Sequence, residues 1–313
     1  MIYLGFDTSN YTTSVATAGD TLMNVRELLE VKKGERGLRQ SDALFQHIKK
    51  LPDLFERISK NIDMNKVEGI GVSTSPRNVD GSYMPVFLAG HGYAKVCADA
   101  LGVPLCTFSH QEGHIMAGIY SCNNISLLEK PFISVHLSGG TCEILLTRYV
   151  DGHFVSEIIG GTKDISAGQL IDRVGVALGL EFPCGKELEK ISLNYEKIIK
   201  LPVNTDDGYI NFSGIETKTL SLINNGERSC LAYSLFDSIS KALSRALNFC
   251  ISEYKCSDVL IVGGVAANSI IKNNLCKNVN ADVNFASVEY STDNAFGVAL
   301  LCERIIQDKL WNK

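Results

Sequence analysis

The sequence contains no apolar run that approaches 18 residues, so no segment of it is expected to span a membrane. It also lacks paired cysteines at C-x2-C spacing and an N-terminal signal sequence. Its ten cysteines are scattered singly, several of them inside apolar segments, which predicts buried reduced thiols and a cytoplasmic protein. With a net charge of -5, the chain has no general excess of basic residues, which argues against a generic polyanion binder.

What is present is an ordinary globular composition: 313 residues, 45% hydrophobic and 21% charged, enough for two domains and a sizeable core. A strand is expected over residues 2–7, then a polar turn and a second strand from Val15. The same pattern recurs about 130 residues later, with strands over 132–137 and 142–147 around the turn Ser138-Gly139-Gly140-Thr141. This repetition predicts a duplicated α/β architecture whose turns can offer hydrogen-bond donors to phosphates.

Periodicity predicts an amphipathic helix over residues 44–58, with a kink or break at Pro52. The polar, glycine-containing segment 204–225 is expected to form a surface loop region. The remaining elements expected are helices over 85–101, 231–254 and 294–310, and short strands over 67–72 and 259–262.

The chain has only six histidines, and two of them, His110 and His114, are four residues apart. On a helix, side chains at i and i+4 lie on the same face, so both imidazoles can reach one metal ion. An isolated pair with this spacing is also common among surface or satisfied polar residues. The meaning of the pair therefore depends on the rest of the sequence.

A third turn, Gly263-Gly264-Val265-Ala266-Ala267-Asn268, follows the strand expected over 259–262. Its glycines would let the backbone approach a ribose or phosphate, and Asn268 could hydrogen-bond a sugar or base. Taken alone, the pattern fits a simple tight turn equally well. Three such turns on a duplicated α/β scaffold, however, resemble the superfamily of actin, sugar kinases and heat-shock chaperone ATPases.

This fold class predicts two actin-like domains. Residues 1–108 plus 294–313 are expected to form the first and 109–293 the second, with the nucleotide and metal site at their interface. A sugar kinase fits less well, because kinases of this superfamily rely on an aspartate base and have no need of a histidine pair.

A more specific resemblance follows from motifs that run nearly from end to end. The chain resembles the transferase subunits of the tRNA threonylcarbamoyladenosine synthases, long labelled O-sialoglycoprotein endopeptidases. The matching segments are Asp7-Thr8-Ser9, Ser109-His110-Gln111-Glu112-Gly113-His114, Leu137-Ser138-Gly139-Gly140, Ala167-Gly168, Ile171-Asp172-Arg173, Leu178-Gly179-Leu180-Glu181-Phe182-Pro183-Cys184-Gly185, Phe212-Ser213-Gly214, Gly263-Gly264-Val265-Ala266-Ala267-Asn268 and Thr292-Asp293-Asn294.

The resemblance implies one divalent metal per chain, Fe(II) or Zn(II), held by His110, His114 and Asp293. Two imidazoles and one carboxylate suit either ion and leave positions open for a substrate. The resemblance also implies that ATP or an acyl-adenylate binds, and its contacts would fall on Ser138, Gly139, Gly140, Asp172, Gly185, Glu189 and Asn268. The activity implied is transfer of a threonylcarbamoyl group to adenosine in tRNA, with protein partners that include a catalytically silent paralogue of the same fold. Considered singly, Asp172 fits a solvated helix residue and Gly185 the end of a turn.

The old peptidase label can be weighed against the residues. A zincin needs His-Glu-x-x-His, with the glutamate as general base next to the first ligand. Here Gln111 follows His110 and the acid is displaced to Glu112, on another side of the helix. Protease activity is therefore not expected.

Several positions depart from the family pattern. Asn10-Tyr11-Thr12-Thr13 stands where Cys-Asp-Glu-Thr is usual, and Thr12 cannot act as a base. Thr141-Cys142 replaces His-Thr, and Glu216 occupies a position where lysine is common. The segment 75–81 replaces a Gly-Pro-Gly loop. These changes leave the metal and nucleotide positions intact and alter groups expected around the acceptor.

Three hypotheses follow, and no side chain is assigned as a catalytic base in any of them. The first is a metal-dependent threonylcarbamoyl transferase acting on tRNA. The second keeps the donor site and changes the acceptor, and a closer synthase with an intact acidic hairpin in the same genome would favour it. The third is a nucleotide-binding regulatory subunit with little turnover, which tight ATP binding without transfer would favour.

Overall fold

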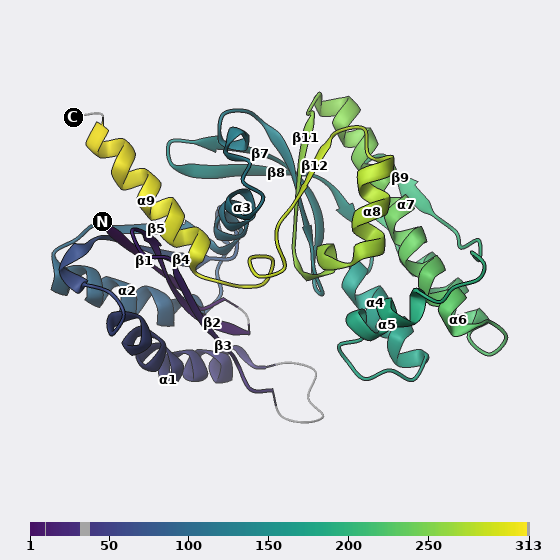
Figure 1. Cartoon of the computed structure of the whole chain (residues 1–313), viewed down its shortest axis with the longest axis horizontal. Coiled ribbons are helices and arrows are strands. Elements are labelled where there is room, and N and C mark those ends of the chain that lie inside the picture. The colour runs from purple at the N-terminus through teal and green to yellow at the C-terminus, as the bar shows by residue number, and fades with distance from the viewer. Residues whose placement is uncertain (10, 32–37, 312–313) are drawn as a thin grey trace. The chain divides into compact units, whose positions relative to one another are not determined.

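The structure is a computed structural model that describes residues 1–9, 11–31 and 38–311. The chain divides into two compact units (Figure 1). The first consists of Met1–Ser121, Tyr149–Val155 and Thr292–Lys313, and the second of Cys122–Arg148 and Ser156–Ser291.

The first unit is built on a five-stranded sheet with the order β3-β2-β1-β4-β5. Strands β1, β2 and β3 form an antiparallel meander, while β4 and β5 run parallel to β1. The second strand begins three residues before the expected Val15, because the ladder with β1 starts at the pair Asp7 and Ser14 and the pairing with β3 extends it to Thr12. The strands are β1 (Ile2–Asp7), β2 (Thr12–Gly19), β3 (Met23–Leu28), β4 (Val67–Ser75) and β5 (Leu105–Ser109).

Helices α1 (Gln40–Ser59) and α2 (Phe87–Leu101) cover one face of this sheet, and α9 (Phe296–Trp311) covers the other (Figure 1). Alternate strand residues explain the two faces. Leu4 and Phe6 pack towards α1 and α2, whereas Gly5 lies against α9, where a Cβ would come within 2.4 Å of the carbonyl oxygen of Ala295. The missing side chain therefore lets α9 pack directly on the central strand. A short 3-10 turn, η1 (Met64–Lys66), precedes β4.

Helix α1 runs through Pro52 as one element, so of the kink or break expected there, the break is wrong. Proline has no N–H and cannot bond the carbonyl four residues back. That carbonyl belongs to Ile48, and it accepts a hydrogen bond from the hydroxyl of Tyr93 on α2 at 3.2 Å. The tertiary contact thus satisfies the acceptor that the local sequence leaves open.

Helix α3 (His110–Ser121) follows β5 directly and packs on α9. The contact is close, since a Cβ on Gly297 would lie 1.8 Å from the carbonyl oxygen of Gly113. As a result, α3 belongs to the first unit, together with Tyr149–Val155 and the chain from Thr292 onward.

The second unit contains a seven-stranded sheet with the order β12-β11-β6-β7-β8-β10-β9. Its part β8-β7-β6-β11-β12 repeats the order of the first sheet, with β6 antiparallel to β7 and parallel to β11. This repeat confirms the duplicated α/β architecture. The strands are β6 (Phe132–Leu137), β7 (Cys142–Val150), β8 (His153–Thr162), β9 (Asn204–Asp206), β10 (Tyr209–Asn211), β11 (Asp258–Val262) and β12 (Asp282–Phe285).

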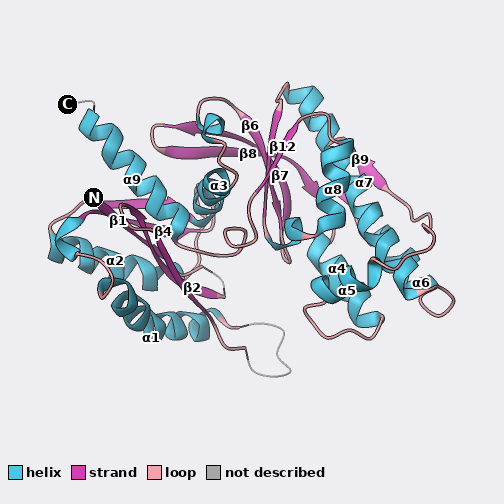
Figure 2. Ribbon diagram, in the orientation of Figure 1, coloured by secondary structure: helices cyan, strands magenta, loops and turns pink. Residues whose placement is uncertain are grey.

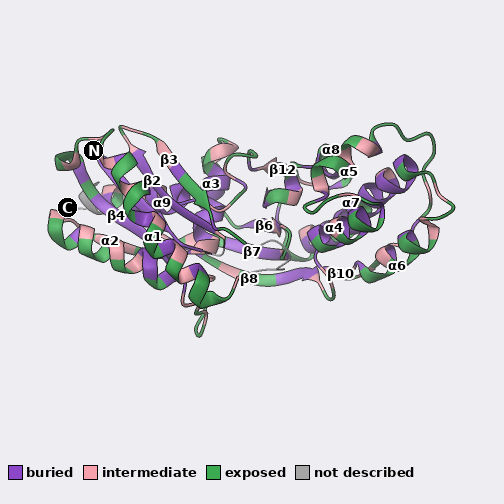
Figure 3. Cartoon of the chain, turned by 90° about the horizontal axis from the view of Figure 1, so that it is seen from below, coloured by how far each residue is buried: buried purple, intermediate pink, exposed green. Residues whose placement is uncertain are grey.

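Helix α7 (Arg228–Tyr254) is the central helix of this unit and is buried along most of its length (Figure 3). It packs with α4 (Ala167–Ala177), α5 (Gly185–Ser192), α6 (Ser213–Leu222) and α8 (Ser269–Asn278) around one apolar core with the sheet (Figure 2). Two 3-10 turns, η2 (Ile125–Leu128) and η3 (Gly264–Ala267), complete the unit. No helix within the described ranges is long and apolar enough to cross a bilayer.

The prediction of a surface loop over residues 204–225 is wrong. This segment forms β9, a tight turn, β10 and α6. Asp207 takes the positive φ that the turn requires, and Ile210, Phe212 and Ile215 are fully buried. A few apolar side chains in a polar segment are enough, because the sheet edge and α7 supply the surface on which they pack.

Candidate functional site

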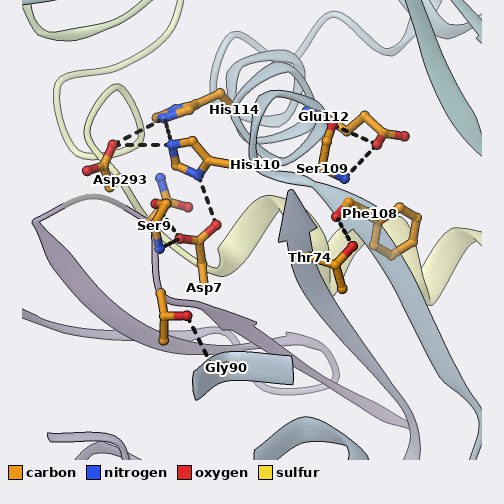
Figure 4. Close-up of polar contacts among 12 residues, drawn as sticks. Asp7, Ser9, Thr74, Gly90, Phe108, Ser109, His110, Glu112, His114 and Asp293 are labelled. Atoms are coloured by element: carbon orange, nitrogen blue, oxygen red, sulfur yellow. Dashed lines mark hydrogen bonds and ion pairs between the residues drawn. The ribbon is translucent and has the colours of Figure 1, made fainter. Parts of the chain in front are cut away.

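The three residues expected to hold a metal meet in the first unit, at the start of α3 and just before α9. The Nε2 atoms of His110 and His114 lie 3.0 Å apart (Figure 4). The Oδ1 atom of Asp293 lies 3.5 Å from Nε2 of His110 and 3.3 Å from Nε2 of His114. The helical spacing aligns the two imidazoles, and the chain that leads into α9 brings the carboxylate to them.

The three atoms fit a divalent cation. In their plane, the point equidistant from all three lies about 1.9 Å from each, close to the ~2.0–2.2 Å that zinc takes to nitrogen and oxygen ligands. His114 is buried and His110 and Asp293 are partly buried, so the cluster is not fully enclosed. The donor set thus offers three ligands and leaves room for a substrate atom.

A fourth side chain, Asp7, belongs to this cluster and was not among the residues expected from the sequence. Its Oδ2 atom lies 2.9 Å from Nδ1 of His110, and its Oδ1 atom accepts a hydrogen bond from the backbone N–H of Ser9 at 2.8 Å. The sequence places Asp7 at the end of an expected strand, but only the strand pairing of the fold brings it to His110. Strands β1 and β5 are parallel to β4, so their carboxyl ends, Asp7 and Ser109, meet at one edge of the sheet, and His110 follows Ser109 directly.

The cluster concentrates negative charge around the imidazoles. Burial opposes ionisation of Asp7, but its contacts with His110 and Ser9 outweigh burial and lower the pKa of the carboxyl. Burial likewise opposes ionisation of Asp293, and the two histidines lower its pKa. Burial opposes protonation of His110, yet Asp7 and Asp293 together raise its pKa to about 10. The site therefore attracts positive charge strongly.

Glu112, the acid that a peptidase would need beside the histidines, is turned away from them (Figure 4). It is 2% exposed and accepts hydrogen bonds from the backbone N–H groups of Ser109 and Phe154 at 2.7 and 3.2 Å. Oε2 also accepts from the hydroxyl of Ser109 at 2.8 Å, and Nδ1 of His153 lies 3.0 Å from Oε1. A buried carboxylate with these partners has no access to a substrate at the histidine pair, in agreement with the sequence argument against a protease.

The first group of expected nucleotide residues, Ser138 to Gly140, forms a tight turn at the end of β6 in the second unit. Ser138 closes the turn, because its N–H donates to the carbonyl of Thr141 at 2.8 Å and its Oγ accepts from the N–H of Thr141 at 3.0 Å. Gly139 and Gly140 are exposed, and a Cβ on either would meet nothing within 4 Å. The backbone of the turn is therefore open to a ligand.

The start of α4 packs against this turn. The hydroxyl of Ser166 donates to the carbonyl of Gly139 at 2.6 Å, and Ser166 also caps α4. A Cβ on Gly168 would lie 2.4 Å from the Cα of Gly139, so only glycine fits there. The second glycine turn adjoins the first, since Gly263, at φ 106°, approaches the carbonyl of Leu137.

Asn268 and Glu189 meet at the N-terminus of α8. The Oδ1 atom of Asn268 accepts from the N–H of Ile271 at 3.0 Å, which makes it the N-cap. Oε1 of Glu189, from α5, accepts from the N–H of Ser269 at 2.8 Å and from the hydroxyl of the same residue. Both residues therefore satisfy helix N–H groups, while the amide nitrogen of Asn268 and the second oxygen of Glu189 are not used in these bonds.

Cys184 links Asp172 on α4 to Gly185 at the start of α5, because it hydrogen-bonds to Asp172 and precedes Gly185 in the chain. The Oδ1 atom of Asp172 accepts from the N–H of Cys184 at 2.8 Å, and burial raises the pKa of this carboxyl while that bond lowers it. Asp172 is thus not a freely solvated helix residue. Gly185 begins a helix instead of ending a turn, and a Cβ there would meet nothing within 4 Å.

Several of the positions that depart from the family pattern can be located in the structure. Thr12 is buried at the start of β2, and its N–H donates to the carbonyl of Ser9 at 3.2 Å, while Asn10 lies outside the described residues. Pro76, in the segment that replaces the Gly-Pro-Gly loop, accepts from the N–H of Gln111 at 3.1 Å and so touches the first turn of α3. Glu216 forms an ion pair with Arg173 of α4.

The chain is similar to known proteins along most of its length. The sequence model of the family described as tRNA N6-adenosine threonylcarbamoyltransferase matches residues 23–300. A curated protein of that name from Mycoplasmopsis synoviae (strain 53) is 28% identical over 309 residues, which cover 96% of this chain and 97% of the relative. One from Clostridium botulinum (strain 657 / Type Ba4) is 33% identical over 250 residues, covering 75% and 70%.

Solved structures agree in fold at low identity. HypF from T. kodakarensis superposes with a TM-score of 0.65 at 15% identity, covering 98% of this chain and 48% of that one. A ROK family glucokinase from Streptomyces griseus gives a TM-score of 0.56 at 11% identity, covering 97% and 100%. These likenesses confirm the actin, sugar kinase and chaperone fold class. By sequence, the chain belongs to the tRNA N6-adenosine threonylcarbamoyltransferase family and is a transferase.

Proposed function

We propose that this chain transfers a threonylcarbamoyl group from threonylcarbamoyl-adenylate to N6 of adenosine in tRNA, with a divalent metal on His110, His114 and Asp293. The observation that carries the proposal is the triangle of ligand atoms, with sides of 3.0 to 3.5 Å, in a member of this family. When bound, a divalent ion supplies Lewis-acid polarisation of an oxygen on the donor. The His₂Asp donor set suits Fe(II) and Zn(II) alike.

The adenylate donor is assigned to the second unit. Gly139 and Gly140 leave the turn open for close approach of a phosphate, and the adjoining turn at Gly263 widens that surface. Asp172, Glu189 and Asn268 supply oxygen and amide groups for the nucleoside. Gly168 packs closely against the turn, and this close packing supports a binding surface that is rigid.

No side chain is assigned as a general base. Thr12 has no charge, and Glu112 is buried with its own partners. We therefore infer that the chain accelerates transfer by holding donor and acceptor in place and by electrostatic stabilisation. An enzyme that acts on tRNA works where tRNA is found, which we infer to be the cytoplasm.

The test is a transfer assay with threonylcarbamoyl-adenylate, the pathway partners and unmodified tRNA that decodes codons starting with A. Nucleosides are read by mass spectrometry, and metal content is measured on the same samples. We expect modified adenosine with the wild type, and loss of both metal and product with His110→Ala.

His153→Ala is the matched control, since His153 lies outside the triangle and Glu112 keeps its two backbone donors without it. It should retain metal and product. Retention of metal and donor without product on tRNA would contradict the proposed acceptor and favour a different one. Donor binding without any turnover would favour a regulatory subunit.

We also infer where a protein partner of the pathway binds. An apolar groove between α1 and α2 is lined by Leu44, Ile48, Leu88, Ala89, Gly92, Tyr93 and Val96. Leu88 and Val96 on α2 are 52% and 68% exposed and Ile48 on α1 is 44% exposed, so both helices present apolar side chains at the surface. The occupant proposed is the catalytically silent paralogue of the same fold.

Val96→Asp should weaken that complex strongly, because it places a charge in the centre of an apolar contact. Binding is measured by calorimetry with the purified paralogue. Val155→Asp is the control, since Val155 is 53% exposed and lies on the β7–β8 hairpin, outside this groove. Equal affinity of the two variants would contradict this binding surface.

A further inference from the structure

We infer that Asp7 is a positioning residue for the metal centre: it holds the imidazole of His110 in the tautomer and orientation that direct Nε2 at the ion. The inference rests on the proposed metal site, and it assigns a role to a residue outside the three ligands.

The two ring nitrogens of His110 have different partners. Nδ1 lies 2.9 Å from Oδ2 of Asp7, whereas Nε2 is the atom that faces His114 and Asp293. A carboxylate can only accept a hydrogen bond, so Nδ1 must carry the proton in this contact. In a neutral imidazole the lone pair is then on Nε2, which is the state that a metal ligand needs.

Asp7 itself is held rigidly. Its other oxygen accepts hydrogen bonds from the N–H and the hydroxyl of Ser9, and the residue is 1% exposed. The next residue, Thr8, is tied to α2, because its hydroxyl donates to the carbonyl of Val86 at 2.9 Å and accepts from the N–H of Gly90 at 3.1 Å. The carboxylate therefore has one position, and the ring that it holds has one orientation.

A buried carboxylate destabilises the folded state unless it is paired. A neutral residue at the end of β1 would avoid this cost. Asp7 instead lies 2.9 Å from Nδ1 of His110, on the side of the ring away from the triangle, which is the geometry of carboxylate–histidine pairs behind metals. If Asp7 had only a structural role, its hydrogen bonds to Ser9 would matter for stability, and its replacement would leave metal binding by His110 unchanged.

Glu112 separates these two roles. It is also a buried carboxylate, 2% exposed, and it also lies 3.0 Å from Nδ1 of a histidine, His153. That histidine lies outside the triangle. Removing the charge of Glu112 should therefore affect folding stability, as removing that of Asp7 would, without affecting the metal.

The experiment compares full-length wild type, Asp7→Asn, Asp7→Ala and Glu112→Gln. Zinc affinity is measured by competition with a chromophoric chelator, and the Co(II)-loaded proteins are compared by their visible absorption. In zinc-loaded samples, ¹⁵N chemical shifts show which nitrogen of His110 binds. We expect zinc affinity to fall about 10–100-fold in Asp7→Ala and less in Asp7→Asn. The Co(II) spectrum should change in both variants. The ¹⁵N shifts should show a mixture of metal bound to Nε2 and metal bound to Nδ1 of His110.

Glu112→Gln should keep zinc affinity and the Co(II) spectrum of the wild type whatever its stability. Asp7→Asn preserves the size of the side chain and provides the answer if Asp7→Ala does not fold. If the wild type binds zinc and both Asp7 variants bind it equally, with unchanged spectra, the inference about Asp7 is overturned and the metal site stands. If the wild type binds no metal, the site and the role of Asp7 are overturned together.

Discussion

The carboxylate of Glu216 on α6 lies 3.3 Å from the guanidinium group of Arg173 on α4. The side chain of Glu216 is 17% exposed and that of Arg173 is 51% exposed, so the pair sits at the surface of the second unit. At residue 216 this chain therefore has an anion that is neutralised by its neighbour. Lys218, two residues further on, is exposed.

Glu216→Lys should tighten tRNA binding and steepen its dependence on salt, because it converts an ion pair into two neighbouring cations. The cost in folding stability should stay within about 1 kcal/mol, since the pair lies at the surface and Arg173 is half-exposed. Filter binding at two salt concentrations measures the effect, with Glu216→Gln as the neutral comparison. Unchanged tRNA affinity in both variants would mean that this face does not contact tRNA.

Gly168→Ala should disturb the turn at Ser138 to Gly140. The new Cβ would lie 2.4 Å from the Cα of Gly139 and 2.7 Å from the carbonyl oxygen of Ser138, and backbone atoms cannot easily move aside. We expect about 1–3 kcal/mol of destabilisation from overpacking. Adenylate affinity should fall by about tenfold or more, which is about 1.4 kcal/mol or more. Denaturant unfolding and calorimetry measure the two effects.

Gly214→Ala is the control for that substitution. Its Cβ would meet only Pro202, at an ordinary 3.9 Å, and alanine favours the helix in which it lies. If both alanine variants bound the adenylate as the wild type does, the turn would not be part of the binding surface.

Asp164 should make stability depend on acid pH. Burial opposes its ionisation, but hydrogen bonds from Ser213, Phe212 and Ile165 outweigh burial and lower its pKa from 3.8 to about 2. Because the pKa is lower in the folded state, the stabilisation is complete above the unfolded value and is lost as pH falls through about 2. Discounted for its exposure, it should amount to about 1 kcal/mol.

Asp164→Asn keeps a side-chain oxygen that can accept the N–H groups of α6 and removes the titration. Unfolding by denaturant at pH 7, 4 and 3 compares it with the wild type. The advantage of the wild type should be constant above pH 4 and shrink below it. A difference that does not vary with pH would show that the charge of Asp164 contributes nothing.

Tyr93→Phe should destabilise the first unit by about 0.5–1.5 kcal/mol, because the carbonyl of Ile48 loses its donor. In a Pro52→Ala background, residue 52 regains an N–H and can bond the same carbonyl. The cost of Tyr93→Phe should then be smaller, and a double-mutant cycle on unfolding free energies measures the coupling. Equal costs in the two backgrounds would rule out this compensation.

The repeated strand–turn–strand pattern was readable because it is local. Residues 2–7 and 132–137 are short apolar runs followed by small polar residues, and the structure has β1 and β6 with these bounds. The helical alignment of His110 and His114 is also local, since it needs only a period of 3.6 residues. By contrast, segment 204–225 was misjudged because its few apolar residues become a core only against α7.

The sequence by itself thus determined the duplicated α/β architecture and the common face of the histidine pair, which depend on neighbours within a few residues. Asp293 could be assigned only through family resemblance, and Asp7 was not assigned at all. Only the tertiary structure decided that Asp7 joins the cluster, because parallel strands align their carboxyl ends regardless of their separation in the chain. Contacts of this kind are set by long-range packing, which no local periodicity encodes.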